Sequence, residues 1–358
     1  MHYHIILTER CNLKCKYCYE KSMKEFENGL EDKWEFDENT PFDSEVKIEE
    51  LKKFLKPSDT LIFYGGEPLV MLNKMIEIID HVDCRFCIQT NGMLLHEIPE
   101  KYLMKLDKML ISIDGDKLRD NENKGLIHYD KIIENINLIK KKGYTGEIVA
   151  RMVITHPDVY EQVLNILNLN LFDSIHWQID AGFYKFDFNE KEFNKFVTEY
   201  NVSISKLLDY WINEIKKSNI IRLYPFFGIL NRIKAWDKET KLPCGAGHNN
   251  FTINTKGDLC ACPIMNSVKN FYCGSIGKGI EKKKYIEDQN CVNCSVFNIC
   301  GGRCLYWRES KLWPVQGEEL VCKTIKHLIH ELNVKTKELN LNSQDFEYER
   351  YFGPEIIP

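Results

Sequence analysis

Short apolar runs alternate with longer amphipathic stretches along residues 1–220 of the chain. The runs have the length of buried strands, and apolar residues within the stretches recur at helical spacing. The predicted strands are 3–7, 61–64, 85–89, 109–113, 147–155 and 174–180. The predicted helices are 69–81, 129–142, 159–167 and 191–217. Strands that alternate with helices indicate a parallel sheet, so we expect an α/β fold.

The composition is that of an ordinary globular protein. Of the 358 residues 44% are hydrophobic and 28% are charged, and the net charge is −5. This balance does not favour a nucleic-acid-binding protein or a polybasic membrane binder. No apolar run has the length of a transmembrane helix, and residues 1–7 lack the features of a signal peptide. We therefore expect a cytoplasmic protein that binds neither nucleic acid nor a membrane.

The cysteines change this picture, because the chain has fourteen of them and they fall in groups. Cytoplasmic thiols stay reduced, which favours metal ligation or catalysis over disulfides. The first group, Cys11, Cys15 and Cys18, directly follows the strand 3–7. Three thiolates would leave one iron of a [4Fe-4S] cluster open to another ligand. The alternative, a structural zinc site, needs a fourth Cys or His, and residues 9–24 contain none.

The spacing Cys11-x3-Cys15-x2-Cys18, with Tyr17 before the last cysteine, resembles the signature of the radical S-adenosylmethionine (radical SAM) superfamily. The resemblance implies a partial (β/α)6 barrel whose [4Fe-4S] cluster chelates SAM at its open iron. Reductive cleavage of SAM then gives methionine and a 5′-deoxyadenosyl radical, which abstracts hydrogen from the substrate. An external electron donor such as ferredoxin or flavodoxin is the expected partner for the reduction.

The ends of the predicted strands supply candidate contacts to SAM, because ligands of parallel sheets lie outside the carboxyl ends of the strands. A Gly-Gly-Glu-Pro turn follows the strand 61–64 and resembles a turn of the family. Glycine lets the backbone approach a ligand closely, and Glu67 is expected to accept from its ammonium group. Arg151 is expected to bind the methionyl carboxylate, with a structural ion pair as the alternative. The candidate contacts are Tyr17, Gly65, Gly66, Glu67, Pro68, Asn91, Ser112, Asp114 and Arg151.

Nine further cysteines lie between residues 244 and 322. With Gly257, seven of them resemble the motif of the SPASM domain, which occurs on radical SAM enzymes that mature peptides, sulfatases and redox cofactors. The resemblance implies two auxiliary [4Fe-4S] clusters, and a pair of zinc ribbons is the alternative. One cluster would use Cys244, Cys262 and Cys304, and the other Cys291, Cys294, Cys300 and Cys322. The eighth ligand is Cys273, which we favour, or Cys260, or the first of these clusters keeps an open iron.

These patterns divide the chain into four parts. We expect a radical SAM barrel over 1–220, a bridging segment at 221–240, a SPASM domain over 241–325, and a C-terminal helix and tail over 326–358. Within the third part, residues 254–257 predict a hairpin turn. A helix is predicted after Cys322, up to about residue 339.

The resemblance favours an enzyme that modifies a peptide or protein oxidatively, by a thioether or C-C crosslink or by side-chain oxidation. The chain begins at its first barrel strand, so we expect it to find a peptide by another route or through a separate leader-peptide-binding protein. Formylglycine formation is disfavoured because Pro263 follows Cys262, where sulfatase-maturing enzymes carry an Asp. Candidate acid-base residues are Tyr19, Tyr64, His176 and Asp180.

Two other functions stay open. The same radical chemistry could act on a small molecule or a redox-cofactor precursor, since one fold hosts many chemistries. A non-enzymatic iron-sulfur electron carrier is the other alternative, but a carrier needs neither the Gly-Gly-Glu-Pro turn nor an open iron at the first cysteine group.

Overall fold

The computed structural model describes residues 1–18, 29–182, 185–235, 242–281, 289–337 and 339. By its internal contacts the chain forms two compact units. The first comprises Met1–Arg151, Asn170–Asp173 and Ala246–Tyr285, and the second comprises Met152–Leu169, Ser174–Gly245 and Ile286–Pro358. The four parts expected from the sequence, from the radical SAM barrel to the C-terminal helix and tail, are a different division of the chain and stay predictions.

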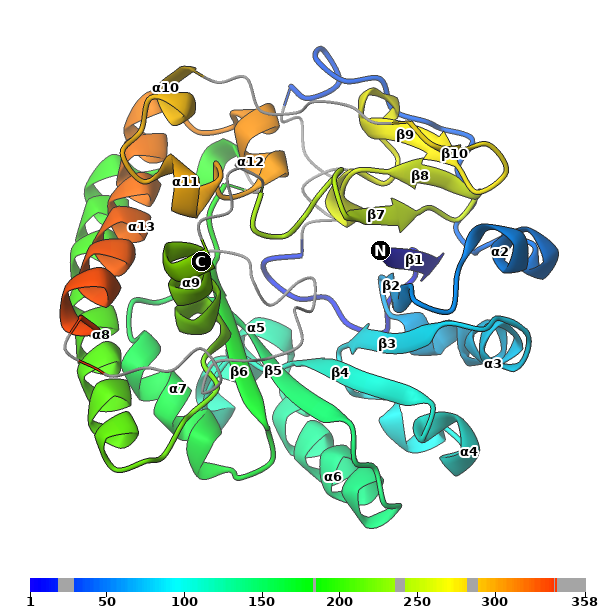
Figure 1. Cartoon of the computed structure of the whole chain (residues 1–358), viewed down its shortest axis with the longest axis horizontal. Coiled ribbons are helices and arrows are strands. Elements are labelled where there is room, and N and C mark those ends of the chain that lie inside the picture. Colours follow the sequence, from blue (N-terminus) through cyan, green and yellow to red (C-terminus); the bar gives the residue numbers. More distant parts are fainter. Residues whose placement is uncertain (19–28, 183–184, 236–241, 282–288, 338, 340–358) are drawn as a thin grey trace. The chain divides into compact units, whose positions relative to one another are not determined.

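A mixed sheet organises the first unit (Figure 1). Its strands are β1 (His2–Thr8), β2 (Thr60–Gly65), β3 (Arg85–Thr90), β4 (Leu106–Ser112), β5 (Glu147–Ile154, up to Arg151 in this unit), β7 (Asn250–Ile253), β8 (Asp258–Cys260), β9 (Tyr272–Ser275) and β10 (Gly279–Ile280). Their order is β10-β9-β8-β7-β1-β2-β3-β4-β5. Strands β1 to β5 are parallel, and β7 pairs with β1 in parallel. Strands β8 to β10 continue the sheet in antiparallel pairs.

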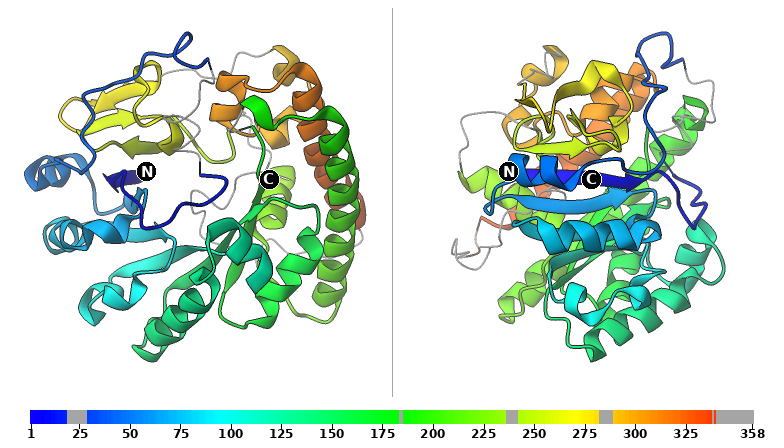
Figure 2. Two further views of the ribbon diagram at one scale, coloured as in Figure 1. Left: turned by 180° about the vertical axis from the view of Figure 1, so that it is seen from behind. Right: turned by 90° about the vertical axis from the view of Figure 1, so that its right-hand side faces the viewer.

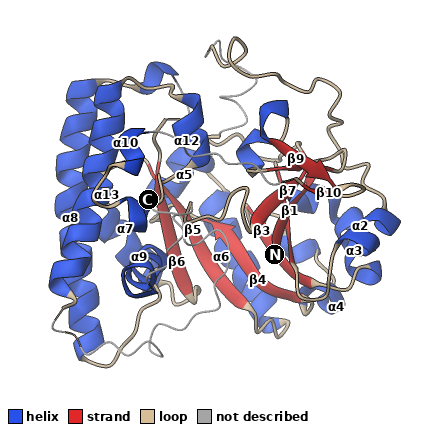
Figure 3. Cartoon of the chain, turned by 45° about the horizontal axis from the view of Figure 1, so that its top comes forward, coloured by secondary structure: helices blue, strands red, loops and turns tan. Residues whose placement is uncertain are grey.

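The helices of this unit are short except for two. They are α2 (Ile48–Phe54), η1 (Pro68–Met71), α3 (Leu72–His81), η2 (Leu95–Glu97), α4 (Glu100–Leu103), α5 (Lys117–Lys124), α6 (His128–Lys141), η4 (Pro263–Met265) and η5 (Lys269–Phe271). Helices α3 and α6 cover one side of the parallel strands (Figures 1 and 3). On α6 the fully buried Ile132, Ile136 and Ile139 recur at helical spacing, as the pattern predicted.

The junction of β1 with β7 is buried and polar. His4 Nδ1 lies 3.2 Å from Asn250 Oδ1, and burial lowers the pKa of His4 to about 3, so this ring is neutral. Beyond β7, the side-chain oxygen of Asn254 accepts from the backbone N–H groups of Gly257 and Asp258 at 3.0 and 2.9 Å. The predicted hairpin turn between β7 and β8 is therefore confirmed.

The second unit is mainly helical. Its elements are the end of β5, α7 (Val159–Asn168), β6 (Ser174–Ile179), η3 (Lys185–Asp187), α8 (Glu190–Lys216), α9 (Tyr224–Ala235), α10 (Gln289–Val292), α11 (Phe297–Cys300), α12 (Leu305–Ser310) and α13 (Val315–Lys335). The long helices α8 and α13 lie side by side (Figures 1 and 2). His327 of α13 joins them, because its Nε2 lies 2.9 Å from Ser205 Oγ and 3.0 Å from the Asn201 carbonyl oxygen.

The predicted α/β class is confirmed, and three details differ. The predicted helix 69–81 opens with the 3-10 turn η1, which begins at Pro68. The expected (β/α)6 pattern has a helix between successive strands, but between β3 and β4 the chain forms the turn η2 and the short helix α4. The helix expected after Cys322 already begins at Val315, so Cys322 lies inside α13. The tail over 340–358 lies outside the described residues.

Among the helices that the structure describes, none combines the length and the apolar character needed to cross a bilayer.

Candidate functional site

The loop after β1 carries the first cysteine group. Cys11 is exposed and Cys15 and Cys18 are partly exposed, and none of the three forms a disulfide. The backbone N–H of Leu13 donates to Cys11 Sγ at 3.4 Å. Burial raises the pKa of Cys11 to about 11 and that of Cys15 to about 12; Cys18 adds to both shifts, and Cys11 adds to the shift of Cys15. The three thiols therefore interact electrostatically, as ligands of one cluster would.

The Gly-Gly-Glu-Pro turn at the end of β2 packs directly on the backbone of this loop. The N–H of Gly66 donates to the Thr8 carbonyl at 2.8 Å, and the N–H of Glu67 donates to the Arg10 carbonyl at 2.9 Å. A Cβ on Gly65 would lie 2.2 Å from the Thr8 oxygen, and one on Gly66 would lie 2.5 Å from the Arg10 oxygen. Glycine is thus required here by close backbone approach, which the cysteine loop itself makes.

Glu67 ties the end of β2 to the end of β3. Its carboxylate is fully buried and accepts from Leu69 N at 3.0 Å, Thr90 Oγ1 at 2.7 Å and Asn91 N at 2.7 Å. Burial raises the pKa of Glu67 to about 7, although all three hydrogen bonds oppose that shift. A carboxylate that already accepts three hydrogen bonds is first of all a positioning group. Its contact with a ligand ammonium stays a prediction.

Asn91, at the end of β3, reaches the cysteine loop. Its Nδ2 donates to Asn12 Oδ1 at 2.7 Å and lies 3.7 Å from Cys11 Sγ. Its Oδ1 accepts from the N–H of Met93 at 3.0 Å, which fixes the orientation of the amide. The structure therefore brings this predicted residue to the first cysteine.

Asp114, just past the end of β4, holds the other side of the same loop. Its buried carboxylate accepts from Tyr17 Oη at 2.7 Å and from Asn123 Nδ2 at 3.0 Å, and it is paired with Lys124. The ammonium of Lys124 lies 5.6 Å from the centre of the Tyr17 ring. Two predicted residues, Tyr17 and Asp114, are thus in contact, and a buried lysine completes the group.

The lysine belongs to a buried charge network that the motifs did not reveal. Lys124 Nζ lies 2.9 Å from Asp120 Oδ1, and Asp120 Oδ2 lies 2.5 Å from His128 Nδ1. The other ring nitrogen of His128 lies 3.0 Å from the Asn91 carbonyl oxygen. Lys124 and His128 hold the pKa of Asp120 below its usual range. Because an ionised carboxylate and a carbonyl only accept, both nitrogens of His128 donate and the ring is cationic.

Two cations therefore balance two carboxylates inside the first unit. The only sequence signal is the spacing of Asp120, Lys124 and His128, which places an acid, a base and a histidine four residues apart. Charged residues at that spacing usually form a solvated helix face, so burial could not be predicted from it.

Ser112 and Arg151 lie beside each other at the ends of β4 and β5. They are register partners, and the N–H of Ile113 donates to the Arg151 carbonyl at 3.1 Å. Both side chains are partly exposed. Their predicted roles in binding SAM stay predictions.

The candidate acid-base residues are dispersed. Tyr64 is buried and its ring meets the ring of His4 edge on, with 5.3 Å between centroids. His176 is fully buried in β6 and Asp180 is partly exposed just after it. Tyr19 lies outside the described residues. No general base follows from these positions.

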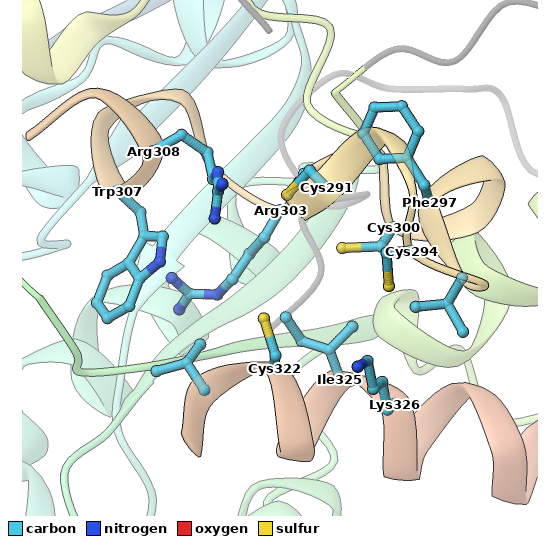
Figure 4. A pocket seen from close by; sticks show the side chains of 13 residues that line it. Cys291, Cys294, Phe297, Cys300, Arg303, Trp307, Arg308, Cys322, Ile325 and Lys326 are labelled. Atoms are coloured by element: carbon cyan, nitrogen blue, oxygen red, sulfur yellow. The ribbon is translucent and has the colours of Figure 1, made fainter. Parts of the chain in front are cut away.

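The second unit holds a pocket that four of the remaining cysteines line (Figure 4). Cys291 is on α10, Cys300 is the last residue of α11, and Cys322 is on α13. The N–H of Cys294 donates to the Cys291 carbonyl at 2.9 Å, which shapes the connection between the helices. The other lining residues are Val296, Phe297, Gly302, Arg303, Trp307, Arg308, Val321, Ile325 and Lys326.

The other C-terminal cysteines are divided between the two units. Cys244 and Cys304 belong to the second unit and Cys262 to the first. Cys260 and Cys273 are fully buried in the first unit and donate to the carbonyls of Asn266 and Leu259 at 3.3 and 3.4 Å. The role of Cys273 as the eighth ligand stays a prediction.

The donor sets fit iron–sulfur clusters better than single metal ions. In the described part of the chain, no three His, Cys, Asp or Glu side chains are arranged around one metal position. A structural zinc ion needs such convergence, whereas each thiolate of a four-iron cluster binds a different iron. Grouped thiols without carboxylates are also the donors that iron–sulfur clusters use.

The comparisons with known proteins agree with this chemistry. Residues 5–169 match the model of the radical SAM superfamily. A match to this superfamily implies a [4Fe-4S] cluster and SAM.

Two curated relatives cover most of the chain. It is 24% identical to the radical SAM cyclopropyl synthase TigE of Paramaledivibacter caminithermalis, over 94% of this chain and 74% of the relative. It is also 24% identical to a cysteine-type anaerobic sulfatase-maturating enzyme of Clostridium perfringens, over 84% of this chain and 87% of the relative.

Solved structures share the fold. Native anSMEcpe with bound AdoMet and the Kp18Cys peptide has a TM-score of 0.68 at 19% identity, over 94% of this chain and 99% of that chain. Streptococcus suis SuiB bound to the precursor peptide SuiA has a TM-score of 0.54 at 15% identity, over 85% of this chain and 71% of that chain. The predicted fold, with its cysteine-rich C-terminal region, is thereby confirmed.

Replacing Gly66 tests the packing of the turn on the cysteine loop. We expect Gly66→Ala to lower the free energy of unfolding by about 1–3 kcal/mol, because the new Cβ meets backbone that has no free space to move into. Gly277→Ala is the control, since a Cβ there meets nothing within 4 Å, and it should change stability by less than about 0.5 kcal/mol. Urea unfolding measures both. Equal stabilities would contradict the contact.

Removing the buried cation tests the charge network. Lys124→Met should lower the free energy of unfolding by about 3–5 kcal/mol, because two buried carboxylates then share one histidine. The double variant Lys124→Met/Asp114→Asn should recover part of that loss. Lys117→Met, which breaks the exposed pair with Asp130, is the control and should cost at most about 1 kcal/mol. If Lys124→Met matches this control in urea unfolding, the network does not stabilise the fold.

The raised pKa of Glu67 predicts a pH dependence. Between pH 4.5 and about 7 the folded protein keeps a proton that the unfolded chain has released, so stability falls as pH rises through this window. Relative to Glu67→Gln, which does not titrate, the wild type should lose up to about 3 kcal/mol across it. Unfolding free energies of both proteins at a series of pH values measure the difference. A difference that stays constant with pH would show that Glu67 is ionised throughout.

Proposed function

We propose that the protein is a radical SAM enzyme that carries out an oxidative modification of a peptide or protein, with two auxiliary [4Fe-4S] clusters of the SPASM type. The observation that carries the proposal is that the cysteines form two separate groups. One lies on an accessible loop beside the strand ends of a radical SAM domain, and the other lines a pocket in the second unit.

In this proposal Cys11, Cys15 and Cys18 hold the SAM-binding cluster. When bound, the cluster supplies the electron that cleaves SAM to methionine and a 5′-deoxyadenosyl radical. The residues of the chain hold the loop in place for this chemistry. Gly66 and Glu67 fix its start by backbone hydrogen bonds, and Tyr17 is anchored by Asp114 near its end.

The strand ends then bind and orient SAM. Asn91 lies beside Cys11, and Ser112 and Arg151 are adjacent at the same edge of the sheet. The partly exposed guanidinium of Arg151 suits a carboxylate, which it binds with two parallel hydrogen bonds. The carboxylates of Glu67 and Asp114 act through the residues they position, because their oxygens are already engaged within the protein.

A peptide or protein is the proposed substrate. Two observations support it: the sulfatase-maturating relative, and two neighbours in fold that were solved with peptides. The product contains a thioether, a C-C crosslink or an oxidised side chain. Pro263 after Cys262 disfavours one form of side-chain oxidation, the formation of formylglycine. An external reductant such as ferredoxin or flavodoxin supplies the electron for SAM cleavage.

Reconstitution under anaerobic conditions tests the proposal. The wild type should bind about twelve irons, as three four-iron clusters require, and release 5′-deoxyadenosine with dithionite and SAM. Cys15→Ala should lose about four irons and all nucleoside release, because the SAM-binding cluster is gone. Cys294→Ala should lose a similar amount of iron and still release nucleoside.

Cys84→Ala is the matched control, since Cys84 lies before β3 and outside both cysteine groups. It should keep both the iron and the nucleoside release. Zinc in place of iron, or nucleoside release by Cys15→Ala, would overturn the proposal.

A further inference from the structure

The pocket of the second unit is lined by cations as well as thiols. Arg303, Arg308 and Lys326 line it, and its described lining contains no Asp or Glu. Outside the lining, Glu318 Oε2 lies 4.0 Å from Arg308 Nη1. This surplus of positive charge suits a bound group with net negative charge, as a cluster with four thiolate ligands has.

Arg303 is one of two buried cations in this pocket, and Arg308 is the other. Arg303 is only 4% exposed, and within the described residues its Nε and Nη2 have no hydrogen-bond partner. A buried guanidinium without such partners is costly, so it calls for a compensating negative charge. Its place is fixed from one side, because its guanidinium carbon lies 5.3 Å from the centre of the Trp307 ring.

The backbone at Arg303 is in an unusual conformation. Arg303 has a φ of +65°, and the preceding Gly301 and Gly302 have φ values of +62° and +90°. A left-handed conformation is uncommon for arginine and costs free energy, which points to a constraint at this position. Figure 4 shows the Arg303 side chain extending toward Trp307, on the side of the pocket where Cys322 lies.

Arg303 and Lys326 both line the pocket with the four cysteines, but they differ in burial. Lys326 is exposed, so water screens its charge, whereas Arg303 acts from the interior.

We propose that Arg303 is the charge-compensating residue of the auxiliary cluster in this pocket and that it makes one-electron reduction of that cluster more favourable. The inference rests on the proposed function. Reduction transfers one electron from the reductant to the cluster, with no bond made or broken in the protein and no proton moved. The negative charge of the cluster therefore increases, and a buried guanidinium beside it stabilises the reduced state more than the oxidised state.

A reductive titration with dithionite, followed by electron paramagnetic resonance, tests this on the reconstituted enzyme. The resonance of this cluster is identified as the one that is present in the wild type and missing in Cys294→Ala. In Arg303→Gln we expect its midpoint potential to become more negative, and in Arg303→Lys to return toward the wild-type value. Lys326→Gln removes the same charge from an exposed position of the same pocket and should shift the potential less than Arg303→Gln.

A second readout is the rate of iron loss to a chelator. It should be faster in Arg303→Gln than in Lys326→Gln, because the cluster then lacks its buried counter-charge. The inference would be overturned if Arg303→Gln and Lys326→Gln had equal midpoint potentials, or if Arg303→Lys had the same potential as Arg303→Gln. Either result would leave the proposed presence of the clusters unaffected. A wild type that binds no iron in this pocket would instead refute the proposed function.

Discussion

Two buried carboxylates hold the cysteine loop that follows β1, and the geometry of the candidate site depends on them. Glu67 fastens the turn after β2 to the start of the segment after β3, through three hydrogen bonds. Asp114 fastens the end of β4 to Tyr17 and to a buried lysine. Because both residues follow parallel strands, they lie at the same edge of the sheet and support the loop from two sides.

The two carboxylates are stabilised differently. Asp114 belongs to a network with Asp120, in which Lys124 and His128 supply balancing charge. Among the described residues Glu67 has no such cation, and it accepts hydrogen bonds from two backbone N–H groups and one hydroxyl. In the pocket of the second unit, by contrast, the described lining contains three cations and no carboxylate. Charge is thus distributed so that the region around the cysteine loop is nearly neutral and the other thiol site is electropositive.

Much of the fold could be predicted from the sequence. Strand-length apolar runs located the strands of the parallel sheet. The structure places the Gly-Gly-Glu-Pro turn and Asn91 beside the first cysteine group, and their contacts with SAM stay predictions. What the sequence did not reveal was the burial of charge. Asp120, Lys124 and His128 look like a solvated helix face, and Arg303 looks like one more residue of a glycine-rich loop. Both become informative only when tertiary packing removes them from water.

The position of Cys322 has a consequence for the biogenesis of the enzyme. Cys291, Cys294 and Cys300 lie on short segments close in sequence, but Cys322 is carried by α13, which packs on α8 and α9. The four thiols therefore meet only after the ribosome has completed α13 and this helix has docked. For the proposed auxiliary cluster, delivery of iron and sulfide to this pocket would therefore follow the docking of α13.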